Sequence, residues 1–366
     1  MRDDNGLTAT KSIPATLDGW AAAPDTTRWP APFPEIVAPL AEVYRRYVDA
    51  ATALDDADAR SVVLLGRRAM PIMTLVQFAL WTDAARRNDQ RFVGNPLFDY
   101  LAGSDVAAPA TLQPIGQSTA EPRNLWLRRL ARTRSWTPWH RMLRAMLAPD
   151  GIALAHNSLL RTSLRTTKRA VRNAYAEEFA VPGKIDEAFL KRVDTTALAN
   201  HVTDALTRNL PVETDVHRRL ASAIGSVFTD SFEDSTRLLA RLRATPKLPD
   251  RLYSGTGGER MSRALGLEIM RRGGEAIRHD HGGSFVLLDS PDSAALNELS
   301  VSSRFVVATP LAAQSTGLLR ARERASPLGP CTIEGGPGDP GLDVGRNGLA
   351  RTPAGKGGRR RVMYVP

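Results

Sequence analysis

A glycine-rich segment around residue 256 carries the first pattern that could do chemistry. It comes at the end of a predicted strand at 251–254, precedes a predicted helix at about 259–272, and consists of Ser254, Gly255, Thr256, Gly257 and Gly258. Backbone amides at such a strand-to-helix turn can bind a phosphate or another anion. The P-loop pattern is absent, and Arg260 stands where the dinucleotide fingerprint requires its third glycine. The segment therefore predicts either a ligand-binding loop or a tight turn that needs positive φ.

A second polar segment, HDHGG at 279–283, follows the next apolar run along the chain. If both runs are parallel strands of one sheet, both segments lie at its carboxyl edge, where open α/β sheets bind ligands. His281 is then the candidate general base and Asp280 a weaker candidate. Gly282 and Gly283 would let a substrate approach the backbone. The alternative is a purely structural His-Gly turn.

Patterns for metals and for nucleophilic catalysis are weak. His279 and His281 would share one face of an extended strand, but no further ligand stands at a recognisable spacing. The single cysteine, Cys331, excludes a disulfide within the chain and a multi-cysteine metal site. No GxSxG elbow occurs, so serine or cysteine hydrolysis is unsupported. We therefore expect neither a metal nor a cofactor.

The net charge of +10 is unevenly distributed along the chain. Residues 123–172 hold eleven arginines and one lysine against a single acid, together with Trp126, Trp136 and Trp139. Such a segment is typical of a solvated helix face, of a membrane-interfacial patch, or of a nucleic-acid-binding surface. No nucleic-acid-binding motif accompanies it, so no specific nucleic-acid partner is expected.

Membrane and export signals are absent from the sequence. No apolar run reaches the roughly 18–20 residues that cross a bilayer, and residues 1–30 lack the apolar core of a signal peptide. We expect a cytoplasmic protein that could contact the inner face of the cytoplasmic membrane through its basic segment.

Strand-like and helix-like segments alternate most clearly in the second half of the chain. Predicted strands at 251–254, 275–279 and 304–310 alternate with predicted helices, and this alternation indicates a parallel sheet covered on both faces. In the first half, SVVLLG at 61–66 predicts a buried strand that leads into a helix at 69–87. Further predicted elements are helices at 35–56, 125–148 and 311–325, a strand at 152–156 and a loop at 94–124. The predicted fold class is α/β, a Rossmann-like parallel sheet with helices on both faces and a helical insertion.

Composition divides the chain into four predicted parts. They are an N-terminal arm and helix at 1–58, a Rossmann-like lobe at 59–328 with a helical insertion at about 159–247, a linker at 329–361, and a strand at 362–366 that would open a second lobe. The linker prediction depends on a Gly/Pro/Arg-rich composition that cannot bury a core.

Four segments carry a resemblance to a known class of proteins. They are SGTGG at 254–258, DHGG at 280–283, RFVVATP at 304–310 and RRVMYVP at 360–366. Together they resemble bacterial capsular or lipopolysaccharide biosynthesis transferases of the two-lobed GT-B glycosyltransferase architecture. In that class two Rossmann-like lobes face each other across a cleft. The resemblance implies an incomplete GT-B-like chain that contains the N-terminal lobe and only the first strand of the C-terminal lobe.

The resemblance also implies a function in surface polysaccharide biosynthesis. A sugar would move from a nucleotide-sugar donor to a carbohydrate or lipid-linked acceptor, with His281 taking the acceptor proton. The amides of Gly257 and Gly258 would position the acceptor or offset the diphosphate charge. Two alternatives stay open: a non-catalytic carbohydrate- or nucleotide-binding module, and an arginine-rich nucleic-acid-binding protein whose affinity would fall steeply with salt.

Overall fold

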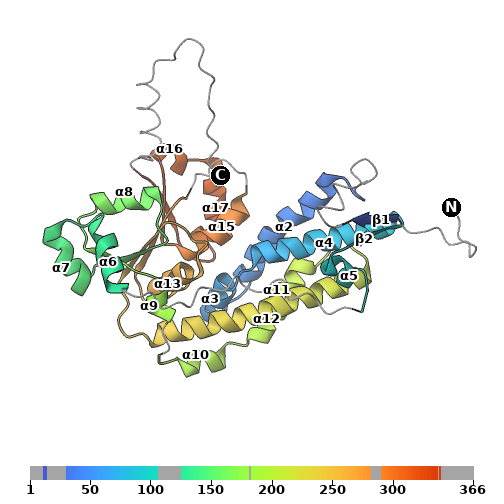
Figure 1. The fold of residues 1–366 in the computed structure, drawn as a ribbon, viewed down its shortest axis with the longest axis horizontal. Coiled ribbons are helices and arrows are strands. Elements are labelled where there is room, and N and C mark those ends of the chain that lie inside the picture. The colour runs from blue at the N-terminus through green and yellow to red at the C-terminus, as the bar shows by residue number, and fades with distance from the viewer. Residues whose placement is uncertain are drawn as a thin grey trace, which may run out of the picture.

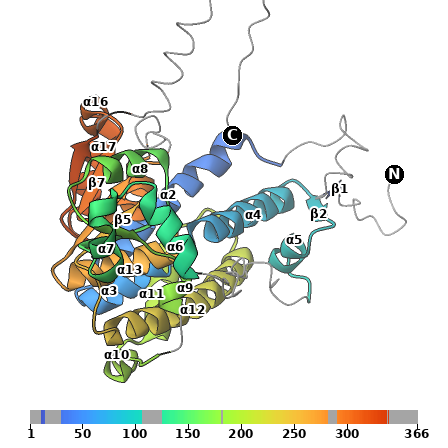
Figure 2. The same cartoon turned by 60° about the vertical axis from the view of Figure 1, so that its left-hand side comes forward.

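The computed structural model describes residues 11–14, 30–105, 125–180, 183–281, 290–336 and 338. Within these residues a six-stranded parallel sheet has helices on both faces, and a layer of long helices packs beside it (Figures 1 and 2). The predicted α/β class, with a Rossmann-like parallel sheet covered on both sides, is confirmed.

The sheet has the strand order β4-β3-β5-β6-β7-β8, and all neighbouring strands are parallel. The strands are β3 (Gly151–Leu154), β4 (Val171–Asn173), β5 (Arg251–Ser254), β6 (Glu275–His279), β7 (Arg304–Val307) and β8 (Thr332–Gly335). From β3 the chain moves outward to the edge strand β4 and then returns to β5 on the other side of β3. The direction of winding therefore reverses between β3 and β5, and the carboxyl edge at such a reversal is where open α/β sheets bind ligands.

Side chains along the strands alternate between two apolar cores. Leu252 and Phe305 lie in the larger core, whereas their neighbours Tyr253 and Val306 lie in the smaller one. The helices over the larger-core face are α13 (Arg260–Arg271), α15 (Pro291–Asn297) and α17 (Thr316–Ala325), and α8 (Ser158–Thr166) covers the other face. Both faces of β3, β5, β6 and β7 are mostly buried, and these four strands coincide with segments that were predicted as strands from the sequence.

A layer of long helices extends the larger core away from the sheet (Figure 1). It is formed by α2 (Phe33–Thr52), α3 (Ala57–Leu65), α4 (Ala69–Arg87), α11 (Thr195–Thr207) and α12 (Thr214–Ala244). The rings of Phe228 and Phe232 on α12 stack with centroids 5.1 Å apart. The Tyr47 hydroxyl on α2 donates to the Val63 carbonyl at 2.7 Å. One contiguous core thus joins the sheet to the helical layer.

The remaining described elements are short. They are α5 (Pro96–Leu101), α6 (Leu125–Arg134), α7 (Trp139–Leu147), α9 (Glu177–Ala180), α10 (Glu187–Arg192), α16 (Pro310–Ala313), a 3-10 helix at Leu299–Val301, and the parallel pair β1 (Lys11–Pro14) and β2 (Gln90–Val93). In the β1–β2 pair, Ile13 packs against Phe92 and Phe98. Part of the predicted N-terminal arm is therefore anchored to the distal end of the helical layer.

The predicted strand at 61–66 is wrong, because these residues belong to α3. The Asp56 side chain accepts a hydrogen bond from the Asp58 amide at 2.7 Å and caps this helix. The four residues from Val62 to Leu65 are all buried. A short helix that is apolar on every side has the same sequence pattern as a buried strand, so periodicity alone could not separate the two.

The predicted linker at 329–361 is wrong at 332–335, where β8 pairs with β7. Glu334 on β8 accepts from both Nε and Nη2 of Arg304 on β7, at 2.9 and 2.6 Å. Cys331 is buried just before the strand. A strand at the sheet edge buries few side chains, so its composition can resemble that of a linker.

Further boundaries differ from the predictions, and the predicted helix at 311–325 is two helices, α16 and α17. The predicted loop at 94–124 contains α5, which Asn95 caps by accepting from the Leu97 amide at 2.9 Å. The predicted helix at 125–148 is two helices, α6 and α7. The predicted insertion at about 159–247 includes α8 and the sheet strand β4 before its long helices begin. The predicted strand at 362–366 lies outside the described residues, so the division into a lobe and a second lobe stays a prediction.

No single helix in the described ranges is long and apolar enough to cross a bilayer. Helices α3 and α4 reach the length and hydropathy of a membrane span only when they are taken together, and the pair is bent by 71°.

Candidate functional site

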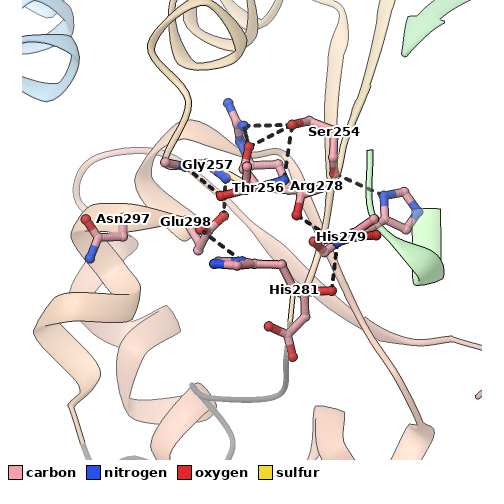
Figure 3. Close-up of polar contacts among 12 residues, drawn as sticks. Ser254, Thr256, Gly257, Arg278, His279, His281, Asn297 and Glu298 are labelled. Atoms are coloured by element: carbon pink, nitrogen blue, oxygen red, sulfur yellow. Dashed lines mark hydrogen bonds and ion pairs between the residues drawn. The ribbon is translucent and has the colours of Figure 1, made fainter. Parts of the chain in front are cut away.

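The two glycine segments predicted from the sequence meet at one edge of the sheet. Strands β5 and β6 are adjacent and parallel, with Ser254 opposite Arg278, so the turns that follow them leave from the same carboxyl edge. This confirms the predicted juxtaposition for residues 254–258 and 279–281, the parts of the two segments that the structure describes. Figure 3 shows the side chains that gather there from β5, β6 and the segment that ends α15.

Asn157 ties the three turns of this edge together. Its amide nitrogen donates to the Gly255 carbonyl at 2.7 Å and to the His279 and Asp280 carbonyls at 3.0 Å. Its amide oxygen accepts from the Leu160 amide at 2.8 Å and caps α8. Ala155, two residues earlier, has a φ of 48°, which residues other than glycine seldom adopt. The Asn157 side chain thus holds the turns together at the point where the direction of winding reverses, and Ala155 beside it has a strained backbone.

Gly255 and Gly257 are needed for close packing and not for positive φ. A Cβ on Gly255 would lie 2.2 Å from the Ala155 carbonyl oxygen, and one on Gly257 would lie 2.3 Å from the Asn297 carbonyl oxygen. Positive φ occurs at neither residue. The prediction of a turn that needs positive φ is therefore wrong, because backbone contact selects these glycines.

The amides of the glycine turn donate to protein groups. The Gly257 amide donates to Oε2 of Glu298 at 2.6 Å, and the Gly258 amide donates to the Thr256 hydroxyl at 2.9 Å. At the start of α13 the Glu259 carboxylate accepts from the Met261 and Ser262 amides. The Glu298 carboxylate and the Thr256 hydroxyl thus accept from the two amides that were predicted to bind an external anion, and in this conformation those amides are not available to a ligand.

Ser254 and Thr256 belong to a buried network around Arg278. Arg278 donates from Nη1 to the Thr256 carbonyl and the Ser262 hydroxyl, both at 2.8 Å, and from Nε to the Val301 carbonyl at 3.1 Å. The Ser254 hydroxyl donates to the Thr256 carbonyl at 2.7 Å. Burial lowers the pKa of Arg278 to about 10. Ser254 and Thr256, predicted to bind substrate, instead hold the turn through these contacts.

His281 is the predicted catalytic residue that reaches the surface. Its side chain is 45% exposed, and its Nδ1 lies 3.9 Å from Oε1 of the buried Glu298 (Figure 3). Burial raises the pKa of the Glu298 carboxyl above its usual value, against the opposing effect of nearby Arg278. This half-exposed imidazole beside a buried carboxyl can accept a proton from a bound hydroxyl while the carboxyl stabilises the resulting cation.

The other predicted site residues lie elsewhere. Asp280 is buried, which leaves it unsuited to contact a substrate directly. His279 is also buried, with its Nδ1 3.3 Å from the Ser254 carbonyl oxygen, and burial lowers its pKa to about 4. His279 and His281 thus make different contacts, and no group of three metal-ligating side chains occurs in the described part of the chain. Gly282 and Gly283 lie outside the described residues.

A second polar pair lies at the outer end of the same edge. Nε2 of His156 lies 2.5 Å from the Asn173 side-chain oxygen, and its ring lies 5.0 Å from that of Trp136. Burial lowers the pKa of His156 to about 4, so the ring is neutral near pH 7. This pair extends the polar edge from β6 across to β4.

Glu298, Asn157 and Arg278 were missed by sequence reasoning. Asn157 carried one usable signal, because an asparagine before a helix is a common cap. Glu298 carried none, because it ends a helix in a polar stretch 41 residues from the glycine amide that it binds.

Comparison with protein-family models, curated protein sequences and solved structures gave no match to this chain.

Proposed function

We propose that the chain transfers a glycosyl group from a nucleotide-sugar donor to a carbohydrate or lipid-linked acceptor at the carboxyl edge of its sheet. The observation that carries the proposal is the half-exposed His281, held beside the buried Glu298 at the edge where ligands bind in this fold class. The acceptor oxygen forms the new bond to the anomeric carbon, and the bond to the diphosphate breaks. The acceptor proton passes to the His281 imidazole.

Glu298 serves as the positioning residue in this reaction. Its Oε2 is held by the Gly257 amide at 2.6 Å, which leaves Oε1 directed toward Nδ1 of His281 (Figure 3). A carboxylate near Nδ1 favours the imidazolium that forms when the ring takes a proton. The glycine turn therefore contributes by fixing Glu298.

Turnover of nucleotide sugars tests this proposal. A panel of nucleotide sugars is assayed for hydrolysis and for transfer to carbohydrate and lipid-linked acceptors. His281→Ala is expected to lower kcat by 10²–10⁴-fold, the usual contribution of a positioned general base. His140→Ala, which removes an exposed histidine on α7, is the matched control and is expected to leave turnover unchanged. Turnover by His281→Ala at the wild-type rate would refute the proposal.

A non-catalytic binding module is the second candidate. The observation that favours it is the internal pairing of the Gly257 and Gly258 amides, which removes two donors that a transferase could use. Saturable binding of a nucleotide sugar without hydrolysis or transfer, in a preparation with native stability, would select this candidate.

We also propose that α6 and α7 bind the inner face of an anionic membrane. Five of the eight exposed large apolar side chains in the described part of the chain lie on these two helices. They are Trp126, Leu127, Trp139, Leu143 and Leu147. The guanidinium of Arg134 lies over the Trp139 ring, 4.4 Å from its centroid. Exposed tryptophan and leucine among arginines are typical of an interfacial helix on anionic lipid.

Trp136 is not part of this surface, because it is buried and donates to the Val171 carbonyl at 3.2 Å.

Vesicle flotation tests the membrane contact. Trp126→Ser/Trp139→Ser is expected to lose at least five-fold of its partition into phosphatidylglycerol vesicles, because both rings are more than half exposed and free to insert. Leu311→Ser removes an apolar side chain that is 80% exposed on α16 and serves as the control. Equal flotation of the two variants, or salt-sensitive binding to nucleic acid in place of vesicles, would refute the membrane contact.

A further inference from the structure

A small cavity lies where the α3–α4 turn meets α12 and the start of α13. Its volume is about 220 Å³. Its walls are formed by Leu65, Arg67, Arg68, Ala69, Met70, Pro71, Ser231, Gly258, Arg260 and Arg263. The elements that form it are far apart in the sequence, and Figures 1 and 2 both show α3 and α13 side by side over α12. We call this the arginine cavity.

Four guanidinium groups line the arginine cavity, and protein carboxylates balance them only in part. Arg260 lies 3.6 Å from Asp234, which it shares with Arg237. Arg68 donates from Nε to the Ser231 hydroxyl at 3.0 Å. Arg263 is buried and donates to four backbone carbonyls, those of Leu64, Gly257, Leu296 and Asn297, so its charge meets no directly paired acid. The cavity therefore carries excess positive charge.

Arg67 differs from the other three arginines because it has no partner among the described residues. Its Nε is buried without a hydrogen-bond partner, and its guanidinium forms no hydrogen bond or ion pair with any residue that the structure describes. Burial also lowers its pKa, which reflects the cost of holding this cation away from water. A buried donor group left unmatched within the protein is costly, so its presence in a cavity calls for an external acceptor.

The backbone adds to the positive potential of the cavity. Helix α4 begins at Ala69, its N-cap residue is Arg68, and no side chain caps its first amides. A 19-residue helix places partial positive charge at this end. Ala69 and Met70 both line the cavity, so the helix end and the arginines act on the same space.

We infer that the arginine cavity binds the phosphate or diphosphate group of a small soluble ligand. Arginine forks match phosphate oxygens in pairs, and no described residue accepts from the Arg67 guanidinium. The cavity is smaller than the roughly 300 Å³ at which sites for whole drug-sized ligands begin. It would thus hold the charged end of the ligand and leave the remainder outside. This inference does not require the glycosyl transfer proposed above.

Calorimetric titration and thermal unfolding with pyrophosphate test the inference. Wild type is expected to bind pyrophosphate saturably and to gain thermal stability from it, since a ligand that binds the native state stabilises it. Arg67→Met should raise the pyrophosphate Kd at least ten-fold. Without ligand, the same variant should unfold about 1–3 °C higher than wild type, because it removes a partly buried cation that has no partner among the described residues. Arg260→Gln should also weaken binding.

Arg218→Met is the matched control, because Arg218 is 77% exposed on α12 and pairs only with Asp215 among the described residues. It should bind pyrophosphate as wild type does. Wild-type affinity in Arg67→Met would overturn the inference. So would a lower unfolding temperature for Arg67→Met without ligand, because Arg67 would then be a structural residue. Binding to phosphatidylglycerol vesicles that depends on Arg67, without binding of pyrophosphate, would overturn the assignment of a soluble ligand.

Discussion

The glycine turn at 254–258 and the arginine cavity are neighbours that differ in how their donors are used. In the turn, the Gly257 amide, the Gly258 amide and the Arg278 guanidinium all donate to protein acceptors. In the cavity, which shares Gly258 with the turn, the Arg67 guanidinium donates to no described residue. The first region is a structural joint, and the second retains donors that a ligand could match.

This difference shows why a glycine motif is weak support for a phosphate site. Gly255 and Gly257 are required because backbones approach within contact distance, a demand that packing alone can impose. A carboxylate from the chain, Glu298, then takes the amide that an external anion would need. The number of unmatched donors therefore indicates a ligand site better than the number of glycines does.

The largest expected effect is a loss of stability on substitution in the glycine turn. Gly257→Ala would place its Cβ 2.3 Å from the Asn297 carbonyl oxygen and 2.6 Å from Oε2 of Glu298. Overpacking together with loss of a buried hydrogen bond should lower the free energy of unfolding by about 3 kcal/mol or more. Urea denaturation measures this. Gly329→Ala, where an added Cβ meets nothing within 4 Å, should change stability by less than about 0.5 kcal/mol. Wild-type stability in Gly257→Ala would show that the glycine turn is not a tightly packed structural joint, as the comparison with the arginine cavity requires.

The second prediction compares the effects on stability of replacing Arg278 and Arg67. Arg278→Met should destabilise the protein by about 3 kcal/mol, because it leaves the Val301 carbonyl without its buried donor and removes the hydrogen bond from Arg278 to the Thr256 carbonyl. The same substitution at Arg67 should stabilise the protein. Denaturation of both variants under one set of conditions gives the two signs, and equal signs would mean that the two regions do not differ as described.

The third prediction concerns pH. Burial lowers the pKa of His279 from 6.5 to about 4, so the unfolded chain binds its proton first as the pH falls. The stability contributed by the neutral ring is therefore fully present above pH 6.5 and is lost as the pH falls toward 4. At 1.36 kcal/mol per pKa unit the loss is at most about 3 kcal/mol. Urea midpoints from pH 7 to pH 4 measure it, and a conformationally stable His279→Asn should show a flatter profile than His140→Asn.

The smallest expected effect is a gain of stability at Ala155, at the carboxyl edge of the sheet. Ala155 holds a φ of 48° beside the glycine turn. Ala155→Gly should relieve this strain and raise the free energy of unfolding by about 0.5 kcal/mol, after the extra entropy of the unfolded glycine is subtracted. A loss of stability would show that the methyl group contributes more through packing than the backbone costs in strain.

Prediction from the sequence succeeded where burial on both faces left a strong local pattern. The strands at 251–254 and 275–279 and the helix at 69–87 were predicted close to their observed limits. It failed for α3, because four consecutive buried residues suit either a strand or a helix. It failed for β8, because an edge strand buries too little to leave an apolar pattern.

The candidate site divides in the same way. The sequence by itself determined that two glycine segments follow neighbouring parallel strands, which is enough to place His281 at the carboxyl edge. Only the tertiary structure decided that Glu298 stands beside His281, that the turn amides are already paired, and that Arg67 is not. Except for the local contact between Gly258 and Thr256, the contacts at the site join residues 17 and 41 positions apart, and local patterns carry no information about which distant group will satisfy a given donor.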